Sequence, residues 1–147
     1  MIVIAHNIRS LHNVGSIFRN AAAFGVEKLY LTGYTGVPPR KEIAKVALGA
    51  QDLIDWEQGE VIKVVEELKM NGYKLYGLET GGDNISNFEA PAKLALVLGS
   101  EVEGIEQSVL DQLDGTLEIP MAAKRSLNVS VASGVAMYQI GRDKISS

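Results

Sequence analysis

The chain has 147 residues, of which 46% are hydrophobic and 22% charged, and its formal net charge is −4 at pH 7. This length and composition predict one globular domain and exclude a disordered, collagenous or fibrous protein. The absence of cysteine excludes disulfide scaffolds, thiolate metal sites and thiol nucleophiles, and two histidines are too few to favour a zinc site. Because the sequence has no signal-peptide pattern and no apolar stretch of membrane-spanning length, we expect a soluble cytoplasmic protein with no metal and no membrane partner.

The first half of the chain is predicted to alternate between strands and helices. Residues 13–25 have the periodicity of a helix, with Asn13 as its N-cap and Gly25 as its stop. The apolar face of this helix consists of Val14, Ile17, Phe18 and Ala21. The other elements expected in this half are strands over 2–5 and 28–32, a loop over 33–39, a short helix over 41–48 and a strand near 53–56.

The second half continues the alternation. Its clearest helix covers residues 60–70, because Val61, Val64, Val65 and Leu68 form one apolar face. The apolar run 94–98 is typical of a strand that is buried on both faces of a parallel sheet. The remaining elements are a strand over 74–79, a turn over 81–84, a short helix over 107–113, a strand over 116–119 and a last helix over 127–142.

This alternation predicts an α/β domain with a largely parallel sheet and helices on both of its faces. Sheets of this kind bind ligands at the carboxyl ends of their strands. A site is therefore expected in the loops that follow Ala5, Thr32, Glu79, Leu98 and Ile119.

The last helix is apolar around most of its circumference. The residues responsible are Val129, Val131, Ala132, Val135, Ala136, Met137, Tyr138 and Ile140. A helix that is apolar nearly all round is buried. Two interpretations stand equally: the helix lies in the centre of the core, or it is buried against a second subunit.

Three polar segments carry the residues that could do chemistry. The first contains Arg19, which points away from the apolar face of its helix, and its pattern alone favours a solvated surface arginine. The second places Glu101 after Gly99 at the end of a buried strand, where a glycine lets a ligand approach the backbone. The third contains Ser126, a candidate N-cap for the last helix.

In this order, the three segments resemble the three motifs of the SpoU (TrmH-type) RNA 2′-O-ribose methyltransferases, a family of the SPOUT knotted superfamily. The first resemblance rests on Asn13, Gly15, Arg19, Ala21, Phe24 and Gly25, and the second on Leu98, Gly99, Glu101 and Gly104. The third rests on Ile119, Pro120, Met121 and the run Ser126-Leu-Asn-Val-Ser130. Between Met121 and Ser126 the chain is one residue shorter than the family pattern and has no glycine.

The resemblance implies a fold, a cofactor and an assembly. The fold is an α/β domain with a deep C-terminal trefoil knot, and S-adenosylmethionine binds in the knot. The active site lies near the interface of a homodimer. We expect residues 1–147 to form a single methyltransferase domain of this type without an accessory RNA-binding domain.

The resemblance also assigns residues to roles. Catalysis would be carried by Arg19, with Asn13, Glu101, Ser126 and Asn128 in support. Cofactor contacts would come from Leu78, Thr80, Leu98, Gly99, Gly104, Ile119, Met121, Ser126 and Leu127. Arg19 would either accept the proton of the ribose hydroxyl or stay charged and stabilise the developing oxyanion, and the second is favoured because arginine keeps its proton in proteins.

Two other functions are compatible with the same residues. One is a non-catalytic RNA-binding or assembly protein that has kept the fold, and the other is a base methyltransferase of the wider superfamily. The run from Ser126 to Ser130 favours the ribose-directed class by its resemblance, and the sequence leaves open whether the substrate is tRNA or rRNA.

The charge of the chain is unevenly distributed along its length. A net charge of −4 by itself disfavours a nucleic-acid partner, but residues 1–50 carry +4, residues 51–120 carry −11 and residues 121–147 carry +3. The first and third motifs therefore lie in basic segments. The candidate RNA-binding residues are Arg9, Arg19, Arg40, Lys41, Lys124 and Arg125.

Overall fold

The computed structural model describes residues 1–145 and contains a six-stranded sheet in which every neighbouring pair of strands is parallel. The order across the sheet is β3-β2-β1-β5-β4-β6. This arrangement confirms the α/β prediction. The strands are β1 (Ile2–His6), β2 (Lys28–Thr32), β3 (Asp55–Gly59), β4 (Lys74–Asn84), β5 (Leu94–Leu98) and β6 (Gly115–Glu118).

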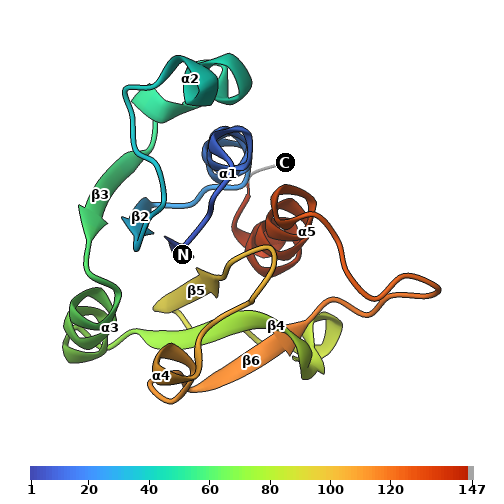
Figure 1. The fold of residues 1–147 in the computed structure, drawn as a ribbon. Coiled ribbons are helices and arrows are strands. Elements are labelled where there is room, and N and C mark those ends of the chain that lie inside the picture. Colours follow the sequence, from blue (N-terminus) through green and yellow to red (C-terminus); the bar gives the residue numbers. More distant parts are fainter. Residues whose placement is uncertain (146–147) are drawn as a thin grey trace.

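Helices cover both faces of the sheet (Figure 1), with α1 and α5 on one face and α3 and α4 on the other. The helix α2 packs on the outer side of α1, and three short 3₁₀ turns follow α2, β4 and α5. None of the helices described is long and apolar enough to cross a membrane. The helices are α1 (Leu11–Ala23), α2 (Lys41–Ala47), α3 (Val61–Met70), α4 (Gln107–Leu110) and α5 (Val129–Gly141).

The two faces of the sheet give two hydrophobic cores, because successive side chains of a strand point to opposite sides. In β1, Val3 and Ala5 join the core under α1 and α5, whereas Ile2 and Ile4 join the core under α3 and α4. Each such aliphatic side chain, once fully buried, contributes about 1.5–3 kcal/mol. The predicted apolar faces of α1 and α3 are confirmed, since all eight of their residues are buried.

The boundaries of the helices differ from the prediction where a different residue caps them. The helix α1 begins two residues earlier than expected because Ser10 is the cap, its hydroxyl accepting a hydrogen bond from the backbone N–H of Asn13 at 3.2 Å. The helix α5 is capped by Asn128, whose side-chain oxygen accepts from the backbone N–H of Ser130 at 2.9 Å. The predictions of Asn13 and Ser126 as caps were therefore wrong.

The predicted turn over 81–84 is instead part of β4. After Leu78 pairs with Leu117, the next pairing along β4 joins Asp83 to the same Leu117, so the residues between them bulge out of the ladder. Gly82 makes the bulge possible, because a side chain there would lie 2.7 Å from the backbone of Thr116. The bulge leaves residues 79–82 outside the pairing between β4 and β6.

The remaining differences are small shifts. Residues 50–52 form a 3₁₀ turn, and β3 therefore covers residues 55–59 instead of beginning near 53. The short helix α4 ends at Leu110, and β6 begins and ends one residue earlier than expected.

The helix α5 has one buried side and one exposed apolar side. Ser133, Ala136 and Met137 are buried under α1, whereas Val135 and Tyr138 are 41% and 51% exposed. Within one chain, α5 is therefore not a helix buried on all sides, and the first of the two interpretations given for it was wrong.

Candidate active site

A cavity of about 370 Å³ lies at the carboxyl ends of β4, β5 and β6. This volume is within the usual range for small-molecule sites, about 300–1,000 Å³. Its walls come from the β4 bulge, the loop after β5, and the segment from the end of β6 into α5. The lining residues are Leu78, Glu79, Thr80, Leu98, Gly99, Ser100, Glu101, Val102, Glu103, Gly104, Glu118, Ile119, Met121, Ser126, Leu127, Val129 and Ala132.

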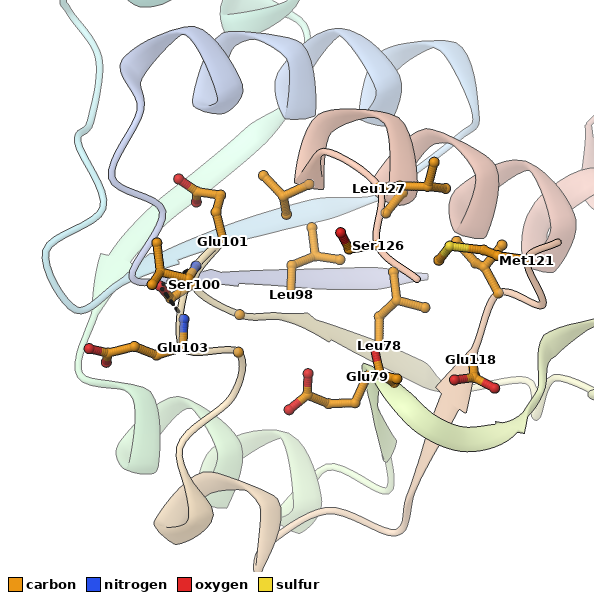
Figure 2. A pocket seen from close by; sticks show the side chains of 17 residues that line it. Leu78, Glu79, Leu98, Ser100, Glu101, Glu103, Glu118, Met121, Ser126 and Leu127 are labelled. Carbon is orange, nitrogen blue, oxygen red and sulfur yellow. Dashed lines mark hydrogen bonds between the residues drawn. The ribbon is translucent and has the colours of Figure 1, made fainter. Parts of the chain in front are cut away.

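The structure brings together residues that are far apart in the sequence. All nine residues expected to contact a cofactor line this one cavity, and so do Glu101 and Ser126 of the expected catalytic set. Figure 2 shows Ser100, Glu101 and Glu103 on one side of the cavity and Met121 and Leu127 on the other.

The loop after β5 is closed on itself and held from both sides. The backbones of Ser100 and Gly104 exchange two hydrogen bonds, of 3.2 and 2.9 Å. Glu79 of the β4 bulge accepts a hydrogen bond from the backbone N–H of Ile105 at 3.1 Å. Just beyond the loop, Glu106 contacts Nε2 of the buried His6 at 2.5 Å. The loop is therefore anchored to both β4 and β1.

The two glycines of the second motif are required by close packing. At Gly99, a Cβ atom would lie 2.6 Å from the backbone carbon of Gly104. Gly104 has a φ of +71°, and a Cβ there would lie 2.9 Å from a carboxylate oxygen of Glu79. Gly99, which was expected to let a ligand approach the backbone, does line the cavity, and its nearest neighbour is this loop's own backbone.

Four carboxylates line the cavity: Glu79, Glu101, Glu103 and Glu118. Glu79 is held by Ile105, and Glu118 accepts a hydrogen bond from the backbone N–H of Gly81 at 2.7 Å. Both Glu101 and Glu103 are exposed on the loop after β5. Sequence reasoning missed Glu79 and Glu118 as lining residues, although each stands at the carboxyl end of a predicted strand, where a site was expected. A concentration of negative charge of this kind favours a cationic ligand.

The other expected catalytic residues lie outside this cavity. Arg19 is exposed on α1 and lines a groove of about 720 Å³ between α1 and α5. Asn13 is buried within α1, and Asn128 caps α5. Within one chain, Arg19 and Glu101 therefore line different depressions.

Contacts between α1 and α5 hold the walls of this groove together. The Asn20 amide donates a hydrogen bond to the backbone oxygen of Ser130 at 2.8 Å, and the ring of Phe24 meets that of Tyr138 edge-on at 5.6 Å. The exposed side chains of Val131 and Val135 continue this apolar surface. The chain thus presents a preformed, largely apolar groove with a cation, Arg19, in its lining.

The basic residues form two separate groups on one chain. Arg9, Arg40 and Lys41 are exposed near the loops after β1 and β2, whereas Lys124 and Arg125 are exposed on the segment between β6 and α5. Figure 1 shows α2 and that segment at different sides of the molecule. The charge of Arg40 is partly engaged, because its guanidinium lies 3.1 Å from Glu42. The pKa of the Glu42 carboxyl is lowered by its own backbone N–H and by Arg40.

Comparisons with known proteins agree on one family. The family model described as the SpoU rRNA methylase family matches residues 1–138. A Staphylococcus aureus (strain COL) protein named as a TrmH family tRNA/rRNA methyltransferase is 34% identical over 146 residues. The match covers 97% of this chain and 59% of that protein, so the chain spans about three fifths of the length of its curated relatives.

Solved structures give the same result. The SpoU methyltransferase AviRb from Streptomyces viridochromogenes, in complex with AdoMet, is 26% identical with a TM-score of 0.88, and the match covers 100% of this chain and 58% of that one. A structure described as giving insights into the 2-OH methylation of C/U34 on tRNA is 25% identical with a TM-score of 0.86, and the match covers 97% of this chain and 95% of that one. On the evidence of its motifs, its fold and these matches, the chain belongs to the SpoU methylase family.

Proposed function

We propose that this chain transfers a methyl group from S-adenosylmethionine to a ribose 2′-hydroxyl of RNA. The observation that carries the proposal is the cavity at the carboxyl ends of β4, β5 and β6, where residues of the second and third motifs meet. Two relatives support it: AviRb was solved with AdoMet, and another relative is described with 2-OH methylation on tRNA.

The lining of the cavity fits S-adenosylmethionine, which carries a transferable methyl group on a positively charged sulfur. Leu78, Leu98 and Ile119 offer apolar surface for a flat adenine ring. The backbone of the loop after β5 offers polar groups near Gly99. Glu101, exposed in the lining of the cavity, adds negative charge that would favour a cationic sulfonium bound there.

A ribose hydroxyl is a weak nucleophile, so the protein has to supply electrostatic help or a base. As the 2′-oxygen bonds to the methyl carbon, the methyl–sulfur bond would break with its electron pair left on sulfur, which gives neutral S-adenosylhomocysteine, and the hydroxyl proton would pass to solvent water. Arg19 is the residue assigned to this step. A guanidinium that keeps its charge orients the hydroxyl and stabilises the negative charge that develops on the oxygen, and this role suits arginine better than that of a base.

We infer that the active unit is a pair of chains that meet through the groove between α1 and α5. The groove combines exposed apolar side chains, Val131, Val135 and Tyr138, with the assigned catalytic residue Arg19. Because Arg19 does not line the cavity of its own chain, pairing offers a way for an arginine to reach a cavity. The same pairing would combine the separate basic groups around Arg9 and Lys124 into an RNA-binding surface.

The test is methyl transfer to bulk RNA that lacks the modification, from S-adenosylmethionine labelled on its methyl group. After digestion to nucleosides, the label is expected on ribose, and Arg19→Ala is expected to lower the rate by about 100-fold or more, since it removes a group that stabilises the transition state. Lys69→Ala, an exposed cation on α3 across the sheet, is the matched control and is expected to keep full activity.

Each alternative outcome points to a different function. Label on base atoms would identify a base methyltransferase, and RNA binding with no transfer would favour a non-catalytic assembly protein. Full activity of Arg19→Ala would contradict the role assigned to that residue.

A further inference from the structure

An exposed tyrosine and an exposed arginine lie together on the loops that follow β1 and β2. Tyr34 is 52% exposed, and the guanidinium carbon of Arg9 lies 5.5 Å from the centroid of its ring. This separation is within the range of a cation–π contact, which is worth little at a solvated surface. The small contribution of this contact to the stability of the fold therefore does not account for the pair.

Two similar pairs, near the amino ends of the strands, differ from this one in how far the tyrosine is buried. Lys28 lies over Tyr30, and Lys93 lies over Tyr73, at 4.9 and 5.3 Å. Tyr30 is only 6% exposed, and Tyr73 packs against the core under α3 and α4. Both of these rings serve to bury apolar area. Among the cation–tyrosine pairs in residues 1–145, only that of Arg9 and Tyr34 has an exposed tyrosine.

The two loops that carry this pair are tied together rigidly. Asn7 adopts a φ of +58°, and its side-chain oxygen accepts a hydrogen bond from the backbone N–H of Tyr34 at 3.1 Å. The hydroxyl of Thr35 accepts from the backbone N–H of Ile8 and donates to the backbone oxygen of Ala5, each at 3.0 Å. Asparagine tolerates this left-handed backbone better than other non-glycine residues, and here its side chain uses it to bond the neighbouring loop. The cost of ordering these loops is thus met before any ligand arrives.

The pair also lies on the same edge of the sheet as the cavity. Along that edge the order of strands is β2, β1, β5 and β4, and β1 pairs directly with β5. The loops after β5 and β4 line the cavity, and the loops after β1 and β2 carry Arg9 and Tyr34. Since β1 is next to β5 and β2 is next to β1, a polymer that runs from the cavity along this end of the sheet toward β2 would pass these two side chains.

We propose that Tyr34 and Arg9 form a stacking platform for one unpaired RNA base that neighbours the methylated nucleotide. This inference rests on the proposed function. An aromatic ring accepts the face of any base, and the planar guanidinium stacks on the ring while reaching a phosphate. RNA is recognised mainly where its bases are unpaired and free to stack in this way. The substrate class is then a loop or single-stranded region, with modest preference for the neighbouring base.

The test uses single-stranded RNAs of roughly 10 nucleotides, each with one fluorescent 2-aminopurine at a different position. Wild-type protein is expected to quench the fluorescence at one or two adjacent positions, as stacking on Tyr34 does. Tyr34→Ala is expected to abolish that quenching and to weaken binding roughly 5- to 100-fold. Tyr34→Phe keeps the ring and is expected to retain both properties.

Three measurements separate stacking from charge and from structure. Tyr34→Ala should leave the salt dependence of binding unchanged, whereas Arg9→Gln should lower its slope by about 0.7, the value for one phosphate contact on a single strand. Tyr73→Phe and Lys93→Ala, from one of the two pairs near the amino ends of the strands, should bind like wild type. The oligomeric state of Tyr34→Ala should match wild type, since its loss would identify the platform as a protein interface and overturn the proposal.

The remaining outcomes distinguish this inference from the proposed function. If wild type binds the RNAs and Tyr34→Ala binds them equally well, the platform is wrong and the proposed function stands. If wild type methylates RNA but does not quench 2-aminopurine at any position, the platform is likewise wrong and the proposed function stands. If wild type neither binds nor methylates RNA, the proposed function fails and the platform fails with it.

Discussion

Glu79 is the carboxylate that connects two walls of the cavity. Its side chain starts on the β4 bulge and accepts the hydrogen bond of Ile105 beyond the loop after β5. The conformation of Gly104 leaves room for this contact and for nothing larger than hydrogen at its Cα. A single side chain thus combines two roles that can be separated by substitution: it holds the loop, and it adds negative charge to the lining.

Glu79→Gln should separate these roles, because it keeps an acceptor oxygen and removes the charge. We expect it to weaken S-adenosylmethionine binding about tenfold, the effect of losing roughly 1.4 kcal/mol of charge interaction, and to leave the affinity for uncharged S-adenosylhomocysteine nearly unchanged. Isothermal titration calorimetry measures both constants. Glu89→Gln, an exposed carboxylate before β5, is the control. Equal losses for the two ligands would show that Glu79 acts only through the loop.

At the scale of elements, α3 shows how a cap sets a boundary. Glu60 accepts hydrogen bonds from the backbone N–H groups of Ile62 and Lys63, each at 3.0 Å. These two donors lower the pKa of the Glu60 carboxyl, with smaller contributions from Lys63 and His6. A lowered pKa in the folded state means that the ionised carboxylate stabilises the fold above the unfolded-state pKa. That stabilisation is lost as the pH falls through the folded-state value.

Glu60→Gln should therefore lower the Tm at pH 7 and have little effect on it in acid, below the lowered folded-state pKa of the Glu60 carboxyl. Thermal unfolding followed by circular dichroism at both pH values measures the difference. Glu66→Gln, in the exposed middle of α3, is the control and should shift the Tm little at either pH. A destabilisation by Glu60→Gln that is the same at both pH values would contradict the role of the carboxylate charge.

The elements that sequence reasoning located best are those with a strong period or a continuous apolar run. The faces of α1 and α3 and the extents of β2 and β5 agree with the prediction, because burial imposes its pattern directly on the residues. Caps were less predictable, since Ser10 and Asn13 both offer suitable oxygens and the packing of the whole helix decides between them. The β4 bulge was not predictable at all, because it depends on pairing with β6, which is remote in the sequence.

The residues of the candidate site were also only partly predictable from the sequence. The motifs assigned residues to the cavity by resemblance, and periodicity alone would have left Arg19 as a surface residue. Glu79 and Glu118 belong to no motif and reach the cavity only because β4 and β6 are neighbours in the sheet. The trefoil knot that the resemblance implies stays a prediction.

At the scale of the whole molecule, the inferred pairing of two chains has its own test. Val135→Glu places a charge in the middle of the groove between α1 and α5. We expect it to convert a dimer to a monomer in sedimentation equilibrium and to abolish methyl transfer, because burying an unpaired charge at an interface is prohibitive. Binding of S-adenosylmethionine should persist, since the cavity is lined by one chain.

Leu53→Glu is the matched control, because Leu53 is an exposed leucine that lies outside the groove. It should keep both the oligomeric state and the activity of wild type. A wild-type protein that is monomeric and active, or a Val135→Glu variant that remains dimeric, would contradict pairing through this groove.

The order of the strands has a consequence for how the chain acquires its binding site. β1 pairs with β2, which follows soon after it in the sequence, but its other neighbour is β5. The pairing of residues 2–5 is therefore complete only when residues 95–98 are in place. Contacts between distant segments close slowly, because the intervening chain has to be ordered first. The cavity needs β4, β5, β6 and the start of α5 together, and we therefore expect it to be completed late in folding. Affinity for a small ligand at this cavity would then report, in a refolding experiment, the arrival of the native state and not of an intermediate that has only its first strands in place.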